Sequence, residues 1–134
     1  MISNETQIRV RYGETDQMGV VYHGNYASYL EVARVEWLRN MGVSYKSIEE
    51  KGIILPVVSL NINYKKPVYY DDVITIKTTL QNKPSVRLDF FYEIINSQKE
   101  IITTATTTLV FVNAETKKPT KAPQYILDAI SKQI

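Results

Sequence analysis

One segment, residues 25–41, has the regular spacing of an amphipathic helix, and the rest of the chain has to cover its apolar side. The apolar residues that recur at helical spacing are Tyr26, Tyr29, Leu30, Ala33, Trp37, Leu38 and Met41. Asn25 is suited to the N-cap position, and Gly42 to the position just past the last turn. The sequence therefore predicts a long helix with one face that packs against another layer of the fold.

Most of the remaining chain alternates between apolar and polar residues with the period of two that is typical of β-strands. The predicted strands are residues 6–12, about 59–64, 74–80, 86–94 and about 100–113. Short polar turns join the last four, so we expect an antiparallel sheet. Two short helices complete the prediction: residues 44–51, capped by Ser44 and ended by Gly52, and a segment around 125–130.

These elements predict an α+β fold in which a curved antiparallel five-stranded sheet wraps around one long helix. The 134 residues fit a single domain, residues 1–134. A chain of this length builds only a shallow core. We therefore expect any sizeable ligand cleft to lie between subunits rather than inside one.

Composition excludes several classes of function. Sixteen Lys and Arg balance 14 Asp and Glu, which argues against a nucleic-acid binder. The chain has no Cys, so disulfides, thiolate nucleophiles and zinc–thiolate sites are excluded, and a single His predicts no metal site. The N-terminus has no signal-peptide pattern, and no stretch approaches the roughly 20 apolar residues of a membrane span. We therefore expect a cytoplasmic protein.

The chemistry is predicted to lie in residues 13–24, between the first strand and the long helix. Three of the five glycines fall there, together with Asp16 and the only His, His23. The first N–H groups of a helix and its dipole favour negative charge, such as the oxyanion that forms on a thioester carbonyl. A carboxylate nearby could attack that carbonyl or activate a water molecule.

The stretch that carries these residues also resembles a known family. It reads Tyr12-Gly13-Glu14-Thr15-Asp16-Gln17-Met18-Gly19-Val20-Val21-Tyr22-His23-Gly24-Asn25-Tyr26. This is similar to the signature of the 4-hydroxybenzoyl-CoA thioesterase-like branch of the hot-dog superfamily, and especially to its bacterial short-chain acyl-CoA thioesterases. Weaker matches are Glu31-Val32-Ala33-Arg34, Tyr64-Lys65-Lys66-Pro67 and Tyr70-Asp71-Asp72, and the resemblance covers about residues 6–113.

The resemblance implies a hot-dog fold and hydrolysis of acyl-CoA to a carboxylic acid and coenzyme A. Coenzyme A is then part of the substrate, and no separate cofactor is expected. Asp16 matches the catalytic carboxylate, as nucleophile or as general base. His23 matches the position whose backbone N–H polarises the thioester carbonyl, with a side chain that assists water or orients Asp16.

The resemblance also implies a set of substrate-binding residues and an assembly. Those at the helix start are Tyr22, Gly24, Asn25 and Tyr26. Val58 and Ser59 match a strand that lines the acyl site of the neighbouring subunit, while Lys65 and Lys66 match a basic spot near the CoA phosphates. Family members are homotetramers built as dimers of dimers, with active sites at the dimer interface.

Plainer interpretations stand beside these. Asp16 and His23 could be structural hydrogen-bonding residues, and Glu14, which we leave out of the catalytic set, is expected to be a solvated neighbour. Glu31 and Arg34 are spaced to pair on the helix surface. Lys65 and Lys66 could simply be solvated.

Two rival functions stay open: a non-catalytic acyl-CoA or acyl-carrier-protein binder, and an enzyme of another reaction, such as an acyl-carrier-protein thioesterase or a hydratase. The hydratase motif of this superfamily is not found. The sequence leaves open the length of the acyl group and whether it is aromatic or aliphatic.

Overall fold

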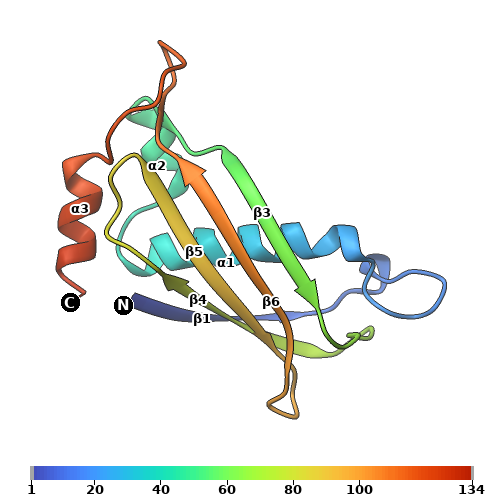
Figure 1. The fold of residues 1–134 in the computed structure, drawn as a ribbon. Coiled ribbons are helices and arrows are strands. Elements are labelled where there is room, and N and C mark those ends of the chain that lie inside the picture. Colours follow the sequence, from blue (N-terminus) through green and yellow to red (C-terminus); the bar gives the residue numbers. More distant parts are fainter. Residues whose placement is uncertain (1, 134) are drawn as a thin grey trace.

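The computed structural model describes residues 2–133. Its elements are β1 (Ile2–Arg9), the one-turn 3₁₀ helices η1 (Tyr12–Glu14) and η2 (His23–Asn25), α1 (Tyr26–Asn40), α2 (Tyr45–Glu50), β2 (Ile53–Ile54), β3 (Val57–Tyr64), β4 (Val73–Leu80), β5 (Arg87–Ile95), β6 (Ile101–Val110), β7 (Val112–Asn113) and α3 (Gln124–Ser131). Figure 1 shows their arrangement.

The predicted five-stranded antiparallel sheet is confirmed, with the strand order β1-β4-β5-β6-β3. The predicted first strand, however, was placed too late. β1 pairs with β4 from Ile2 opposite Leu80 to Arg9 opposite Val73, after which the chain leaves the sheet. Tyr12, the last residue of the predicted strand, is 76% exposed because it lies in η1. The last predicted strand is divided, since β7 leaves the sheet to pair with β2.

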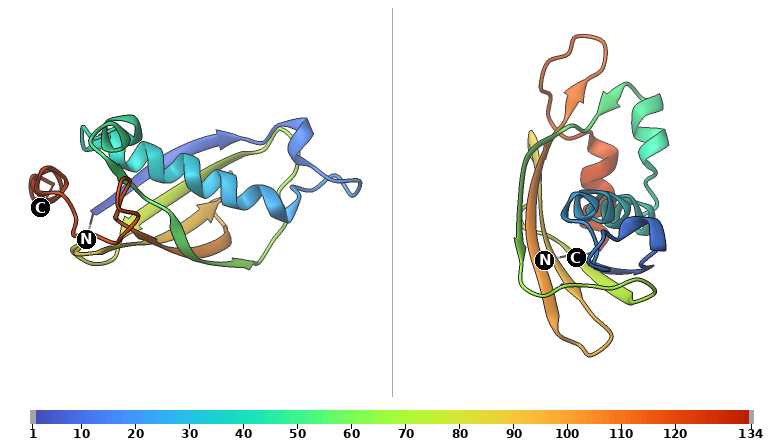
Figure 2. Two further views of the ribbon diagram at one scale, coloured as in Figure 1. Left: turned by 90° about the horizontal axis from the view of Figure 1, so that it is seen from above. Right: turned by 90° about the vertical axis from the view of Figure 1, so that its right-hand side faces the viewer.

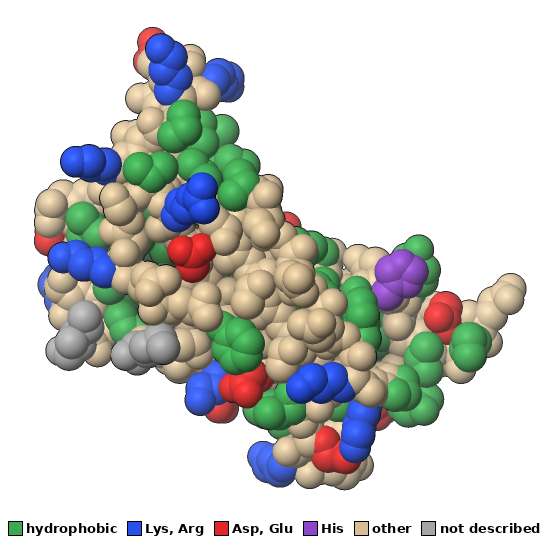
Figure 3. Space-filling model, in the orientation of Figure 1, with side chains coloured by type: hydrophobic (Ala, Val, Ile, Leu, Met, Phe, Trp, Pro, Cys, Tyr) green, Lys and Arg blue, Asp and Glu red, His purple; other side chains and the backbone are tan. Residues whose placement is uncertain are grey.

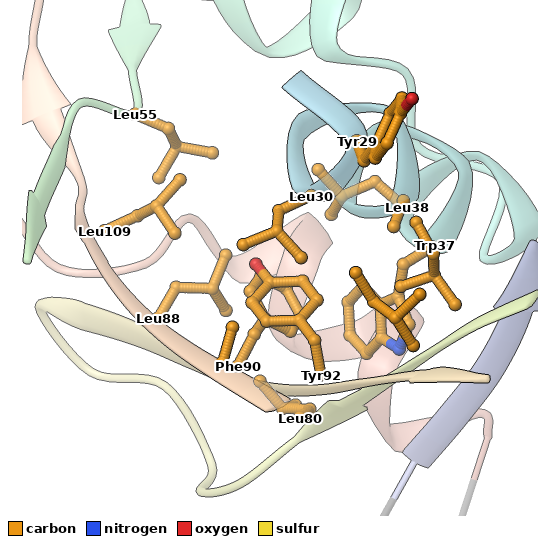
Figure 4. Close-up of a cluster of buried hydrophobic side chains, with 14 of the residues drawn as sticks. Tyr29, Leu30, Trp37, Leu38, Leu55, Leu80, Leu88, Phe90, Tyr92 and Leu109 are labelled. Carbon is orange, nitrogen blue, oxygen red and sulfur yellow. The ribbon is translucent and has the colours of Figure 1, made fainter. Parts of the chain in front are cut away.

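α1 packs against the concave face of this sheet, as the two views of Figure 2 show. The apolar stripe predicted for the helix is buried as far as Leu38. Figure 4 shows Leu30, Trp37 and Leu38 pointing from α1 toward the side chains of the sheet. The Trp37 and Phe90 rings meet edge to face at 4.9 Å. Each large side chain buried in this way contributes about 1.5–3 kcal/mol to stability.

Gly42 ends α1, as predicted. It has a φ of +83°, and the N–H groups of Gly42 and Val43 donate to the carbonyl oxygens of Arg39 and Leu38. These two hydrogen bonds form a Schellman motif. The cap predicted for α2 is also confirmed, because Ser44 Oγ accepts a hydrogen bond from the Ser47 N–H at 3.1 Å.

β3 is one edge of the sheet, and it is the strand whose burial differs most from the prediction. Both faces are mostly exposed, including Val57, Val58 and Leu60 at 43%, 58% and 45%. The register shifts between Val57 and Ser59, so Val58 is the extra residue of a β-bulge. Within residues 2–133, no helix has the length and apolarity needed to span a membrane.

Candidate active site

Residues 15–21 form a small hairpin that projects from the body of the molecule (Figure 1). Its base is held by a bridge between Thr15 and Val21 and by the Tyr22 N–H, which donates to the Glu14 carbonyl oxygen at 2.9 Å. A second bridge joins Val20 to Tyr69. The two sides of the loop are therefore fixed where they leave the fold, while its tip extends into solvent.

Asp16 lies in the turn at the tip and is exposed. Its Oδ1 accepts a hydrogen bond from the Met18 N–H at 2.9 Å, and its carbonyl oxygen accepts one from Gly19, which has a φ of +80°. Within residues 2–133, the Met18 N–H is the only hydrogen-bond partner of this carboxylate. A single chain therefore presents Asp16 to solvent and does not bond it to His23.

Glu14 is the residue that ties the loop to the helix, so the expectation of a solvated neighbour is wrong. Its side chain is only 15% exposed. Oε1 accepts hydrogen bonds from the Arg11 N–H at 2.8 Å and from the Tyr29 hydroxyl at 2.9 Å, and Oε2 binds the Arg11 guanidinium. Burial by itself would raise the pKa of Glu14, but these hydrogen bonds outweigh it and lower the pKa below its ordinary value. The sequence pattern did not predict that the charged side chain of Glu14 would be largely buried and would join the loop to the helix.

The start of α1 differs in detail from the prediction. Asn25 occupies the N-cap position, but its side chain makes no capping hydrogen bond. Instead its Nδ2 donates to the Glu14 carbonyl oxygen at 2.8 Å. The helix is preceded by η2, and within the described residues the N–H groups of His23 and Gly24 have no acceptor. Two backbone donors are therefore available at the positive end of the helix.

Four aromatic rings, those of Tyr22, His23, Tyr26 and Tyr64, lie close to one another at the start of α1. Tyr22 is half exposed, and its ring lies 4.4 Å from that of His23, measured between centroids. A Cβ at Gly24 would come within 2.6 Å of Tyr22 Cε2, so only glycine lets the Tyr22 ring lie where it does. The exposed His appears in purple beside hydrophobic side chains in Figure 3. Tyr26 is buried, and its ring meets that of Tyr64 edge to face at 5.0 Å.

An open cleft of about 260 Å³ brings several of the predicted residues together. Its lining consists of Val21, His23, Tyr26, Tyr64, Lys65, Lys66 and Pro67. Tyr64 also donates its hydroxyl hydrogen to the His23 carbonyl oxygen at 3.2 Å. We did not single out Tyr64 from the sequence, although it begins the Tyr64-Lys65-Lys66-Pro67 match.

The two lysines differ in their ion pairing, since Lys65 makes no ion pair with the residues that the structure describes. Lys66 makes an ion pair with Glu100, which offsets part of its charge.

Val58 and Ser59 are exposed and lie toward the opposite end of β3 from Tyr64. Because a strand rises about 3.3 Å per residue, they lie roughly 20 Å from the cleft of their own chain. A single chain thus assembles His23, Tyr26, Lys65 and Lys66, but not Asp16, Val58 or Ser59.

Comparison with known proteins identifies the family. Residues 10–130 match the model of the thioesterase-like superfamily. The chain belongs to the thioesterase-like superfamily. It is 38% identical over 116 residues to the proposed acyl-CoA thioesterase YneP of Bacillus subtilis, covering 87% of this chain and 84% of that protein.

Two further relatives support this family assignment. The acyl-CoA thioester hydrolase YbgC of Escherichia coli is 30% identical over 120 residues, which is 90% of each chain. The solved structure of a DHNA-CoA thioesterase from Staphylococcus aureus superimposes with a TM-score of 0.92 at 43% identity, covering 98% of this chain and 91% of that one. The hot-dog fold and the thioester hydrolase class predicted for this thioesterase-like protein are confirmed by these relatives.

Proposed function

We propose that this chain hydrolyses acyl-CoA thioesters, with Asp16 as the catalytic carboxylate and the His23 and Gly24 N–H groups as donors to the thioester carbonyl. The observation that carries the proposal is the pair of backbone N–H groups at the start of α1, which have no acceptor in the described part of the chain and lie beside the open cleft that Lys65 and Lys66 line. Relatives described as acyl-CoA thioesterases support the choice of substrate.

In the proposed reaction, water attacks the thioester carbonyl carbon while Asp16 takes up its proton. Backbone donors stabilise the oxyanion that forms, and the C–S bond breaks as the carbonyl re-forms. The proton on Asp16 then passes to the departing thiolate, which leaves as the thiol of coenzyme A. Alternatively, the Asp16 carboxylate attacks the carbonyl carbon first and expels the thiolate of coenzyme A. Water then hydrolyses the resulting anhydride, which restores Asp16 and releases the acid, and the proton that water loses balances the thiolate. Lys65 and Lys66 bind the phosphates of coenzyme A by charge attraction.

We further propose that a second copy of the chain completes the site by pairing along β3. This edge strand has eight residues, Val57–Tyr64, none of them charged, and it carries exposed apolar side chains. Edges of this kind are normally protected by charges, proline or a partner strand. Pairing would place Val58 and Ser59 of each copy against its partner. The tetramer, the single domain of residues 1–134 and the cytoplasmic location stay predictions.

Two variants of Asp16 test the catalytic proposal. Thiol release from a panel of acyl-CoA esters should fall by about 100- to 10,000-fold in Asp16→Asn and Asp16→Ala, the usual contribution of a positioned acid or base. Both variants should fold, because Asp16 is exposed. Asp128→Asn, an exposed aspartate on α3, is the matched control and should keep full turnover. Unchanged turnover in the two Asp16 variants would remove this residue from the mechanism.

One observation favours a second candidate, a non-catalytic acyl-CoA binder: Asp16 is exposed, and within residues 2–133 its carboxylate is hydrogen-bonded only within its own turn. Calorimetry separates the two functions. Binding of acyl-CoA by the wild type with no thiol release across the panel would identify a binder, whereas turnover identifies the enzyme.

A further inference from the structure

A second cleft, of about 220 Å³, lies between α1 and β3. Its lining residues are Ala27, Ser28, Glu31, Arg34, Val57, Leu60 and Thr107. The α1 residues of this lining follow one side of the helix from its first turn, directly after the proposed oxyanion donors. The cleft shares no lining residue with the cleft of His23 and Lys65, but it begins beside the first turn of α1, and Arg34 is its α1 residue farthest from that turn.

Arg34 is unusual for a charged side chain, because it is only 6% exposed. The sequence predicted a surface pair with Glu31, which is wrong: Glu31 is exposed, and no ion pair joins the two within residues 2–133. Arg34 Nη1 makes one long hydrogen bond, 3.3 Å, to the Tyr92 hydroxyl, and its Nε is buried with no partner among the residues that the structure describes. A buried cation without a counter-ion is costly, so a role outside the isolated chain is favoured.

The neighbours of Arg34 hold it in place without neutralising it. The Tyr92 hydroxyl is 2.6 Å from Thr107 Oγ1, which fixes that hydroxyl in the sheet. Burial raises the pKa of Tyr92, so its phenol stays neutral and supplies no negative charge, although Arg34 acts in the opposite direction. The guanidinium has further N–H donors that can bind an oxygen acceptor, and a carboxylate or phenolate is the best acceptor for them.

We infer that Arg34 selects the substrate by binding an oxygen acceptor at the end of the acyl group remote from the thioester. This inference rests on the proposed function, because it places the thioester carbonyl at the start of α1. Tyr26 and Arg34 are eight positions apart, which is about 12 Å along a helix. Arginine side chains lean toward the helix start, which shortens the span to be bridged. An extended or ring-bearing acyl group fits between Val57 and Leu60 on one side and the helix on the other.

Matched pairs of substrates test the inference: hexanoyl-CoA against adipoyl-CoA, and 2-naphthoyl-CoA against its ring-hydroxylated counterpart. The wild type should prefer the oxygenated member of at least one pair in kcat/KM. Arg34→Met should reduce that preference by about 10- to 100-fold, the worth of a hydrogen bond between charged groups, and leave the plain member nearly unchanged. Which pair responds distinguishes a carboxylate acceptor from a phenolic one.

Two further variants show whether the effect comes from the guanidinium. Arg34→Lys keeps the charge but loses the planar set of guanidinium N–H donors, so it should retain only part of the preference that Arg34→Met loses. Arg39→Met, an exposed arginine paired with Glu36 on the same helix, should leave the preference intact. Thermal unfolding of each variant tests whether it folds, and Arg34→Met should fold, since replacing a buried charge with an apolar side chain is commonly tolerated.

Each outcome decides between the inference and its rivals. Equal loss on the plain and oxygenated members in Arg34→Met would assign Arg34 a structural role and overturn the inference. A changed oligomeric state with an unchanged preference would mean that Arg34 binds a carboxylate of a second copy, which also overturns it. Thiol release without preference in the wild type would overturn the inference alone, whereas no thiol release from any ester would overturn the proposed function with it.

Discussion

The Tyr29 hydroxyl donates a hydrogen bond to Glu14 Oε1 at 2.9 Å, and so joins the first turn of α1 to the base of the Asp16 hairpin. The Asn25 side chain makes a second link to the same residue. Burial raises the pKa of Tyr29, and the Glu14 carboxylate that accepts a hydrogen bond from its hydroxyl raises this pKa further. Tyr29 therefore stays a donor at neutral pH. Together these contacts set where the hairpin leaves the fold relative to the helix start.

Removing this link should lower both stability and turnover. Tyr29→Phe should lower the free energy of unfolding by about 1.5 kcal/mol, the lower end for a hydrogen bond to a charged group, because the Arg11 N–H still binds Oε1. Thiol release should fall several-fold as the hairpin loosens. The matched control is Tyr125→Phe, which removes a buried hydroxyl that has no partner within residues 2–133 and should not destabilise. Equal losses in both variants, measured by urea unfolding, would contradict the assigned role of Tyr29.

The lowered pKa of Glu14 predicts how stability depends on pH. A carboxylate whose pKa is lower in the folded state contributes its full stabilisation of the fold at pH values above its unfolded pKa, here 4.5. It loses this contribution as the pH falls through its folded pKa. Unfolding free energies of the wild type and Glu14→Gln should therefore differ most near pH 7 and converge in acid. A difference that is the same at pH 7 and pH 3 would show that the charge of Glu14 does not stabilise the fold.

Gly42 should not accept a side chain without loss of stability. Its φ of +83° costs an L-residue about 1–2 kcal/mol. Gly42→Ala should lower the thermal midpoint accordingly. Gly13→Ala is the control, because a Cβ there would meet no atom within 4 Å and its φ lies outside the positive range. Equal midpoints for the two variants, measured by calorimetry, would contradict this account of the helix end.

The β3 edge should control assembly. Val58→Glu places a charge at the exposed bulge and should shift the protein toward the monomer in light scattering, with a loss of thiol release. Glu5→Gln on the opposite edge strand β1 should change neither property. A wild type that is monomeric yet active would show that one chain is sufficient and would remove the need for pairing along β3.

Several features of this protein follow from local sequence. The α1 stripe, the Schellman glycine Gly42 and the Ser44 cap are visible in the sequence because each depends on residues within a few positions of one another. The order of strands and turns after residue 57 is also local information. The cluster of His23, Lys65 and Lys66 was anticipated only through the family resemblance, since their separation in the sequence gives no geometric reason for them to meet.

The tertiary structure decided which polar groups are buried and which are presented to solvent. Glu14 was expected to be solvated and Arg34 to pair on the surface, yet both are largely buried. Glu14 binds Tyr29 of α1, and Arg34 lies on the side of α1 that meets Tyr92 of β5. Asp16, by contrast, extends away from the chain that carries it. Sequence periodicity reports which face of an element is apolar. The burial of a charge depends on contacts between elements far apart in the chain, and those contacts exist only once the sheet has closed around the helix.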